Sequence, residues 1–165
     1  MANAPAQARS NYLETFHQPH LSIYFPIIGY WKERSVVTGV KKEILDIVKV
    51  VNAIQIPALG DIRPQQTRPA REIVNMLTII NKYKRQGETR DMITIACCIP
   101  LYFLGLAWSS AALVVGAIFL AMFHLLSLIH HSNQRDSNQD LIRDINQKLG
   151  ENRFVDFDGV ALKMT

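Results

Sequence analysis

Five histidines are the side chains in this sequence best suited to acid–base chemistry or metal binding. His17 and His20 stand in a polar leader with no other ligand type beside them. His124 lies inside an uncharged apolar run, where an ionisable residue is by default a hypothesis for a functional site. We expect an intramembrane polar site there, a proton relay or a contact between helices, with Ser127 or Tyr102 as partner. The plainer interpretation is a neutral histidine buried near a helix end.

Two adjacent pairs complete the set of possible metal ligands. His130 and His131 point about 100° apart on a helix, so they cannot easily share one metal ion, and we expect them to mark the headgroup boundary. Cys97 and Cys98, the only cysteines, lie inside the apolar run, where thiols behave as small hydrophobic side chains. The sequence therefore predicts no disulfide, no metal site and no cofactor.

An acidic row follows the apolar run, with Asp136, Asp140 and Asp144 at a spacing of four. Carboxylates one turn apart can suggest a cation site, but on a solvated helix they are more often simply exposed. Arg135 and Arg143 are nearby counter-charges. The row is therefore interpreted as a solvated helix face.

No catalytic motif is present. The fragment Asp156-Phe-Asp-Gly159 resembles the start of a calcium loop but lacks the remainder of its twelve residues. There is no glycine-rich phosphate loop, no nucleophile elbow and no His-Glu-x-x-His pattern. The sequence predicts no catalytic residue, and we expect a protein that is not an enzyme.

The element that must position these residues is the stretch 92–131, forty residues without an acid, lysine or arginine. A single straight helix of that length would be roughly 60 Å long, about twice the hydrocarbon thickness of a bilayer. The stretch therefore predicts a transmembrane hairpin with spans over 92–107 and 111–130 that turns at Trp108-Ser109-Ser110. Serine hydroxyls suit the turn, and a tryptophan suits the headgroup region.

Two alternatives remain open. The first limb is short and contains Pro100, Tyr102 and Gly105, which favours a re-entrant segment leading into one span near 104–129. A buried hairpin of a soluble protein is the other alternative.

Basic residues flank the apolar stretch on both sides, while the turn carries no charge. Under the positive-inside tendency both ends of the hairpin, and so both termini, belong in the cytoplasm. The N-terminus has no apolar core and is not a secretory signal, so we expect an integral protein of the cytoplasmic or an organellar membrane. The flanking residues expected at the headgroups are Lys82, Lys84, Arg85, Arg90 and Arg135.

Small residues recur at Gly105, Ser109, Ala112 and Gly116. Small residues four apart let membrane helices approach closely. They predict a helix-packing face, either toward a second chain or, as the simpler interpretation, between the two limbs of the hairpin.

Charge is distributed unevenly along the chain. Residues 1–91 hold 13 Lys and Arg against 8 Asp and Glu, whereas residues 132–165 hold 5 against 6. A mildly basic part beside a bilayer is attracted to anionic headgroups. The basic residues are not interleaved with aromatic ones, so nucleic acid is not an expected partner.

The order of segments predicts an all-α, or nearly all-α, integral membrane protein. We expect a flexible leader over 1–18, a small cytosolic domain over 19–91, the hairpin over 92–131, and a cytosolic helix with a tail over 132–165. Pro26 and Gly29 argue against a helix in the aromatic segment 20–31, which is interpreted as an edge strand, an interfacial segment or part of the core.

Apolar periodicity predicts three helices outside the hairpin. The first covers 38–55, and the second starts at Thr67 with Pro69 in its first turn and ends at Gly87. The segment between them, 56–68, is predicted to be a loop. The third covers 133–149 and can continue the second span. The tail has strand-like composition with a turn at Asp158-Gly159.

These features favour a non-catalytic, membrane-anchored subunit or adaptor of a larger assembly, such as a secretion, transport or respiratory complex. The expected partners are the lipid bilayer and other membrane subunits or a second copy of the chain, because so small a domain can need a partner to bury its apolar faces. One alternative is a hairpin that shapes or permeabilises the membrane. A further alternative is an oligomeric channel or transporter subunit.

Overall fold

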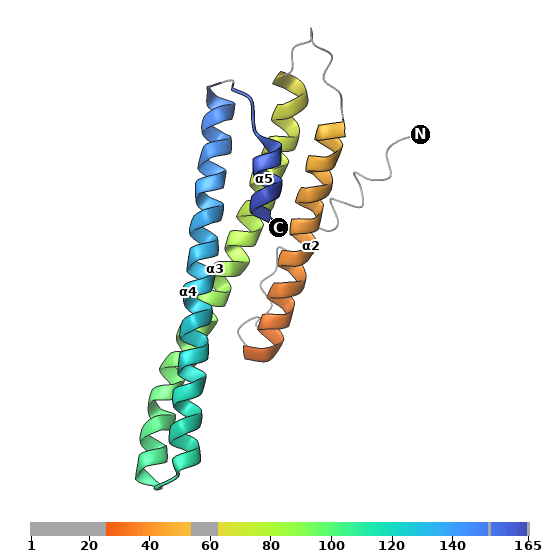
Figure 1. Ribbon diagram of the computed structural model, residues 1–165. Coiled ribbons are helices and arrows are strands. Elements are labelled where there is room, and N and C mark those ends of the chain that lie inside the picture. The colour runs from red at the N-terminus through yellow and green to blue at the C-terminus, as the bar shows by residue number, and fades with distance from the viewer. Residues whose placement is uncertain (1–25, 54–62, 152, 165) are drawn as a thin grey trace.

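The computed structural model describes residues 26–53, 63–151 and 153–164, and within these ranges the regular structure is entirely helical. The elements are α2 (Pro26–Ala53), α3 (Arg63–Ala107), α4 (Ala111–Gly150) and α5 (Phe157–Met164), shown in Figure 1. The prediction of an all-α protein is confirmed for these residues.

Helices α3 and α4 form one long antiparallel hairpin (Figure 1). Ser109 has a positive φ of 52°, and the N–H of Ser110 donates to the carbonyl of Gly105 at 2.8 Å, which closes the last turn of α3. Ser110 then caps α4, since its Oγ accepts from the N–H of Leu113 at 3.5 Å. The predicted turn at 108–110 is confirmed.

Helix α2 begins at Pro26, twelve residues earlier than the periodicity predicted. Pro26 did not exclude a helix, because proline fits the first turn, where its missing N–H has no intrahelical partner to lose. Gly29 lies inside the helix and is buried. The prediction that 20–31 avoids helix is therefore wrong for residues 26–31, and residues 20–25 lie outside the described part.

Helix α3 passes through both positions that were expected to bound it. It starts at Arg63, so residues 63–68 are helical rather than a loop, and Pro69 lies within the helix. Gly87 does not end it either, because the helix continues to Ala107. Helix α4 likewise runs unbroken from the turn through the predicted helix 133–149. The predicted domain boundaries at 91 and 131 therefore fall inside continuous helices.

The tail is helical, which corrects the predicted strand and its turn. Asp156 precedes α5, and its Oδ1 accepts from the N–H of Gly159 at 2.9 Å, the geometry of a helix N-cap. Capping by Asp156 decides the conformation over the strand-like composition. The amide of Asn52 donates to Asp158 at 2.6 Å, and α5 packs on α2 instead of pairing as a strand.

One apolar core holds the ends of the helices remote from the hairpin turn. Val40, Ile44, Ile73 and Leu77, on the facing sides of α2 and α3, belong to it. Helix α4 contributes Leu141 and Ile145 to this core, and α5 contributes Phe157, Val160 and Met164. The apolar faces of 36–51 and 73–83 are thus buried within the chain itself, and we call this four-helix region the head.

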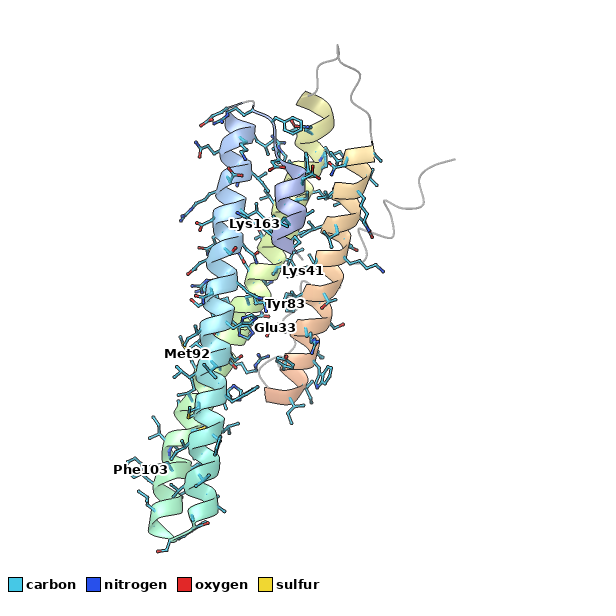
Figure 2. All side chains as sticks on the ribbon, in the orientation of Figure 1. Glu33, Lys41, Tyr83, Met92, Phe103 and Lys163 are labelled. Atoms are coloured by element: carbon cyan, nitrogen blue, oxygen red, sulfur yellow. The ribbon has the colours of Figure 1, made fainter. Side chains whose placement is uncertain are left out.

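The part of the hairpin beyond the head has the opposite arrangement. Large apolar side chains there point outward, among them Phe103, Trp108 and Phe119, each more than 60% exposed. Small ones, such as Gly105 and Ala117, are buried between the limbs. Figure 2 shows the side chains of this region projecting from both helices. Two helices, over Gln66–Ala107 and Ala111–Gly150, are long and apolar enough to cross a membrane.

Candidate functional site

The contact between α3 and α4 follows a seven-residue repeat. Every seventh residue of α3 from Ala70 to Gly105 is buried, namely Ala70, Leu77, Lys84, Asp91, Cys98 and Gly105. The same holds on α4 for Ala117, His124, His131, Asn138 and Ile145. A seven-residue repeat is the packing pattern of a coiled coil. The middle of this seam is polar and ionisable.

Helix α2 joins the seam through one carboxylate. Glu33 is buried, and its Oε1 lies 3.0 Å from Nζ of Lys84 while its Oε2 accepts from Nη2 of Arg90 at 3.1 Å. The side chains of Glu33 and Arg90 are 4% and 1% exposed. Removing one member of such a buried ion pair leaves an uncompensated charge, which costs several kcal/mol.

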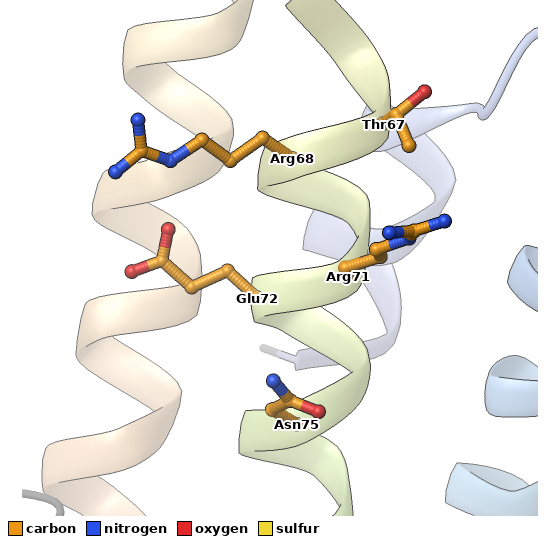
Figure 3. Close-up of a pocket in the computed structure, with 5 residues that line it drawn as sticks. All are labelled: Thr67, Arg68, Arg71, Glu72 and Asn75. Carbon is orange, nitrogen blue, oxygen red and sulfur yellow. The ribbon is translucent and has the colours of Figure 1, made fainter. Parts of the chain in front are cut away.

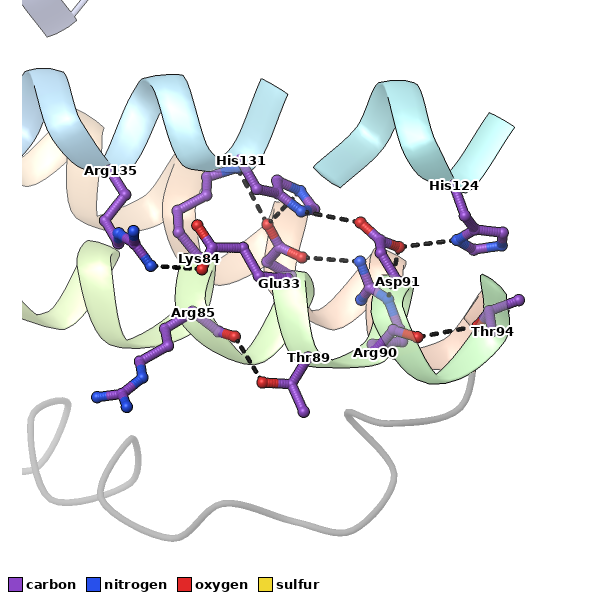
Figure 4. A network of polar contacts seen from close by, with 11 residues as sticks. Glu33, Lys84, Arg85, Thr89, Arg90, Asp91, Thr94, His124, His131 and Arg135 are labelled. Atoms are coloured by element: carbon purple, nitrogen blue, oxygen red, sulfur yellow. Dashed lines mark hydrogen bonds and ion pairs between the residues drawn. The ribbon is translucent and has the colours of Figure 1, made fainter. Parts of the chain in front are cut away.

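His131 links this pair to the other carboxylate of the seam. Its Nε2 lies 3.1 Å from Oε1 of Glu33, and its Nδ1 lies 3.2 Å from Oδ2 of Asp91 (Figure 4). A neutral imidazole would place a lone pair near one of these carboxylates, whereas an imidazolium is attracted to both, even though the 3.2 Å contact with Asp91 lacks hydrogen-bond geometry. The geometry therefore favours the protonated form.

The pKa values of the three groups follow the same logic. Burial on its own lowers the pKa of His131, but the contacts with Asp91 and Glu33 outweigh it, so the pKa lies above its usual value. Burial on its own raises the pKa of Glu33, yet His131 and the charge of Lys84 hold it below the usual range. Asp91 behaves like Glu33, with His131 and His124 overcoming burial to lower its pKa.

His124 extends the chain of contacts one step toward the hairpin turn. Its Nδ1 lies 2.8 Å from Oδ1 of Asp91, and its side chain is 7% exposed. The expected partners Ser127 and Tyr102 are not its hydrogen-bond partners in the structure. Glu33, His131, Asp91 and His124 thus form a continuous line of four ionisable side chains drawn from three helices. Beyond His124 the buried seam residues are apolar or small, so this polar line does not continue to the turn.

Gly87 makes room for the line. A Cβ at this position would lie 2.7 Å from Oε2 of Glu33 and 2.9 Å from Cε1 and Nδ1 of His131. Any side chain at position 87 would therefore collide with both Glu33 and His131. The glycine is in mid-helix because of close approach between helices, and it does not mark a helix end.

The basic residues expected at the headgroups divide into two groups. Lys84 and Arg90 are buried in the ionic seam, and Arg135 is partly buried in an ion pair with the buried Glu88. Lys82 and Arg85 are exposed. Only these last two have the solvent access that contact with lipid headgroups requires.

The small residues of the predicted packing face also divide. Gly105 is buried, and a Cβ there would lie 2.9 Å from the backbone N of Val114, so it allows the two limbs to approach. Ser109, Ala112 and Gly116 are exposed, and nothing lies within 4 Å of a Cβ built on Gly116. The contact between the limbs thus uses one of the four positions.

The remaining polar features form no further site. Asp140 and Asp144 are exposed and pair with Arg143 at 3.7 Å and Lys148 at 2.8 Å, as expected of a solvated helix face. His130 is exposed, unlike its neighbour His131. Among the described residues no group of three His, Cys, Asp or Glu side chains has the geometry to hold a metal ion.

A surface pocket lies at the end of α3 remote from the hairpin turn (Figure 3). Its five lining residues, which all belong to α3, are Thr67, Arg68, Arg71, Glu72 and Asn75. Arg68 and Glu72 point toward α2, and Arg71 points to the other side. Side chains that diverge in this way from one helix do not converge on a ligand.

Sequence reasoning missed Glu33 and Asp91 as members of the site. One signal was present in the sequence: His124, His131 and Asn138 are spaced by seven, which is the repeat of a buried seam rather than of a solvated face. The contact with Glu33 had no such signal, because it joins residues more than fifty positions apart in the chain.

The arrangement can hold α2 against the hairpin, fix the register of α3 on α4, and exchange a proton through His131. The residues of the seam include no nucleophile poised by a base, and none of their spacing matches a known catalytic constellation. No protein-family model, curated protein or solved structure matches this chain.

Proposed function

We propose that this chain is a non-catalytic, membrane-anchored protein whose hairpin stands in a bilayer and whose head serves as a subunit or adaptor of a larger membrane assembly. The observation that carries the proposal is the inverted packing of residues 92–130. Phe103, Phe119 and Phe123 face outward while Gly105 and Ala117 lie between the limbs. In water the large apolar side chains would be the ones to bury, so a hairpin built this way is matched to lipid.

The surroundings of the ionic seam support the same placement. The first residues of α2 add exposed apolar and aromatic side chains beside the seam, namely Ile27, Ile28, Tyr30 and Trp31. Tryptophan and tyrosine favour the interface between lipid and water, and the exposed Lys82 and Arg85 suit the headgroups. We place the membrane surface at this level, with the head on the cytoplasmic side.

The adaptor role rests on the connection between head and hairpin. Helices α3 and α4 cross the proposed membrane surface without a break, and Glu33 locks α2 to both through Lys84, Arg90 and His131. A head fixed in this way presents its outer surface to partners at a constant orientation. Because its own helices complete its core, a partner would engage exposed residues rather than finish the fold.

Cysteine labelling tests the anchor. Cys97 and Cys98 are replaced by alanine, and single cysteines are placed at Ala111 beside the turn and at Leu162 in the head, both exposed positions. An impermeant maleimide is then applied to sealed vesicles of either orientation. We expect Leu162 to react only from the cytoplasmic side and Ala111 only from the opposite side. Reaction of both positions from the same side would refute a spanning hairpin.

Photo-crosslinking tests the adaptor role. A photoreactive amino acid at the exposed Arg71 of the head is compared with one at the lipid-facing Phe119 in native membranes. We expect a discrete protein adduct from position 71 and mainly lipid adducts from position 119. A stable monomer in several mild detergents, without an adduct from position 71, would count against an adaptor.

One observation favours the second function, a wedge in one leaflet that bends the membrane. The first limb has sixteen residues between Met92 and the end of α3 at Ala107, and sixteen residues rise only about 24 Å against a hydrocarbon core of about 30 Å. In that case the cysteine at Ala111 reacts from neither side, and purified protein deforms liposomes. This outcome separates the wedge from the anchored adaptor.

A further inference from the structure

A pocket of about 280 Å³ opens beside the ionic seam, between the first turns of α2 and the two limbs of the hairpin. Its walls are mainly apolar and aromatic, and its polar groups are Arg90, Asp91, His124 and Ser127. An apolar pocket with a few convergent polar groups is the usual form of a small-molecule site. At the proposed membrane surface, such a pocket would be filled from the lipid phase.

We propose that this pocket binds a neutral lipid alcohol with a flat, rigid body, of sterol or quinol type, whose hydroxyl group forms a hydrogen bond with Nε2 of His124.

The orientation of His124 decides which of its ring nitrogens is left for a ligand. Asp91 occupies Nδ1 at 2.8 Å, and an ionised carboxylate can only accept, so Nδ1 of His124 carries the proton (Figure 4). Nε2, on the other edge of the ring, is the nitrogen left for a ligand. A hydroxyl group can both donate to and accept from a ring nitrogen, whereas a ketone or an ester can only accept.

The charge of the pocket selects a neutral head. Among the described residues, Arg90 and Asp91 are the charged ones that line it, and they carry opposite charges. Arg90 already donates to Glu33 at 3.1 Å, and Asp91 is engaged by both histidines. The two charges offset each other, so the pocket has no net positive charge to attract an anionic phosphate headgroup. Nε and Nη1 of Arg90 have no hydrogen-bond partner among the described residues and can donate to a neutral hydroxyl oxygen.

The walls select a flat body. Tyr30 and Trp31 of α2 and Phe123 of α4 all line the pocket, and Tyr30 and Trp31 pack edge to face with ring centroids 6.3 Å apart. Aromatic walls of this kind favour a planar ring system over a flexible acyl chain. Leu120 and Ile27 continue the apolar lining for the rest of the ligand.

Trp31 supplies the readout of the test. The chain has two tryptophans, so a Trp108→Phe background leaves Trp31, in the pocket lining, as the only one. Its fluorescence is titrated in detergent micelles and in nanodiscs with a dibrominated sterol, with a short-chain hydroquinone, and with a dibrominated phosphatidylcholine as a lipid without the hydroxyl head. We expect saturable quenching by the sterol, the hydroquinone or both, and only weak, non-saturating quenching by the phosphatidylcholine.

Two variants identify the site, and a third is the control. His124→Asn keeps an amide N–H for Asp91 but has no Nε2, and Leu120→Phe fills the pocket without touching the ionic seam. Each should raise the half-saturating concentration by about tenfold or more, the effect of losing a buried hydrogen bond or the space for a ring. Leu126→Phe adds the same bulk on an exposed position of α4 outside the pocket and should leave the titration unchanged.

Quenching by the sterol alone or by the hydroquinone alone supports the proposal and identifies which body the pocket accepts. The proposal is overturned if neither quenches saturably, if the phosphatidylcholine quenches equally, or if Leu120→Phe leaves the titration unchanged. If His124→Asn fails to fold, as judged by its helical circular dichroism, Leu120→Phe still decides. The inference rests on the bilayer anchor proposed above. A protein that cannot be reconstituted into nanodiscs argues against that anchor. A reconstituted protein in which neither alcohol quenches the fluorescence of Trp31 argues against this site alone.

Discussion

Asp91 and His124 face each other across the seam between α3 and α4, with 2.8 Å between Oδ1 and Nδ1, at a depth where the outer surface of the hairpin is already apolar. Asp91 is the last charged residue of α3 before its apolar limb. Buried polar pairs at seam positions fix the register of packed helices, because any slip leaves the polar groups without partners. We infer that this pair, together with His131, fixes how the two limbs align.

Glu33→Gln should weaken the docking of α2 strongly. It removes the carboxylate that balances Lys84 and Arg90, and loss of one partner from a buried ionic cluster costs about 3–5 kcal/mol. The measurement is unfolding of the detergent-solubilised protein, followed by circular dichroism.

Asp46→Asn is the matched control on the same helix. It breaks the pair with Lys49 at 3.6 Å, whose side chains are mostly exposed, and should change stability by less than about 0.5 kcal/mol. Equal effects of the two substitutions would show that Glu33 is not a structural anchor.

Gly87→Ala and Gly39→Ala should have effects of opposite sign. Both glycines lie inside helices, where alanine is normally favoured by about 0.5–1 kcal/mol. A Cβ at position 39 meets nothing within 4 Å, whereas at position 87 it meets Glu33 at 2.7 Å. Thermal melting should therefore rise for Gly39→Ala and fall for Gly87→Ala. A stabilised Gly87→Ala protein would contradict the close approach of the helices.

Stability should depend on pH with a maximum between 4.5 and 6.5, the ordinary pKa values of glutamate and histidine. The pKa of Glu33 is lowered in the folded protein, so its contribution is complete above 4.5 and is lost as the pH falls through the lowered value. The pKa of His131 is raised, so its contribution is complete below 6.5 and is lost as the pH rises through the raised value. Melting temperatures recorded in one detergent from below pH 4.5 to above pH 6.5 measure both losses of stability.

His131→Gln separates the alkaline loss of stability from the acidic one. It removes the group that loses its proton at the alkaline end and keeps Glu33, so the loss of stability above pH 6.5 should disappear while the loss below pH 4.5 remains. His130→Gln, at the exposed neighbouring position, should leave the whole profile unchanged. If His131→Gln still loses stability above pH 6.5, another group causes that loss.

Phe119→Lys should impair membrane insertion, because it places a charge on the outward face of the second limb, where Phe119 is 70% exposed. A lysine at the centre of a membrane helix costs about 2.5–3.5 kcal/mol on insertion scales. Leu162→Lys is the control, since Leu162 is 79% exposed but belongs to the head. The fraction of protein that resists alkaline extraction from membranes should fall only for Phe119→Lys.

The sequence alone determined the helical class, the hairpin and its turn at 108–110. These follow from local features: an uncharged, apolar run of forty residues is long enough for two membrane-spanning helices, and a pair of serines lies near its middle. The same local rules misjudged Pro26, Gly87 and the tail. A proline is tolerated in a first turn, a glycine is used for close packing as well as for ending helices, and Asp156 caps a helix within a strand-like sequence.

Only the tertiary structure decided the composition of the ionic seam. Glu33 meets Lys84, Arg90 and His131 across separations of more than fifty residues, and no local pattern records such a meeting. Lys84 and Arg90 read as headgroup cations from their place beside the apolar run, but packing of three helices turns them inward. The physical reason is that a buried charge needs a partner of opposite charge at contact distance, and which helix supplies that partner is settled only when the helices are assembled.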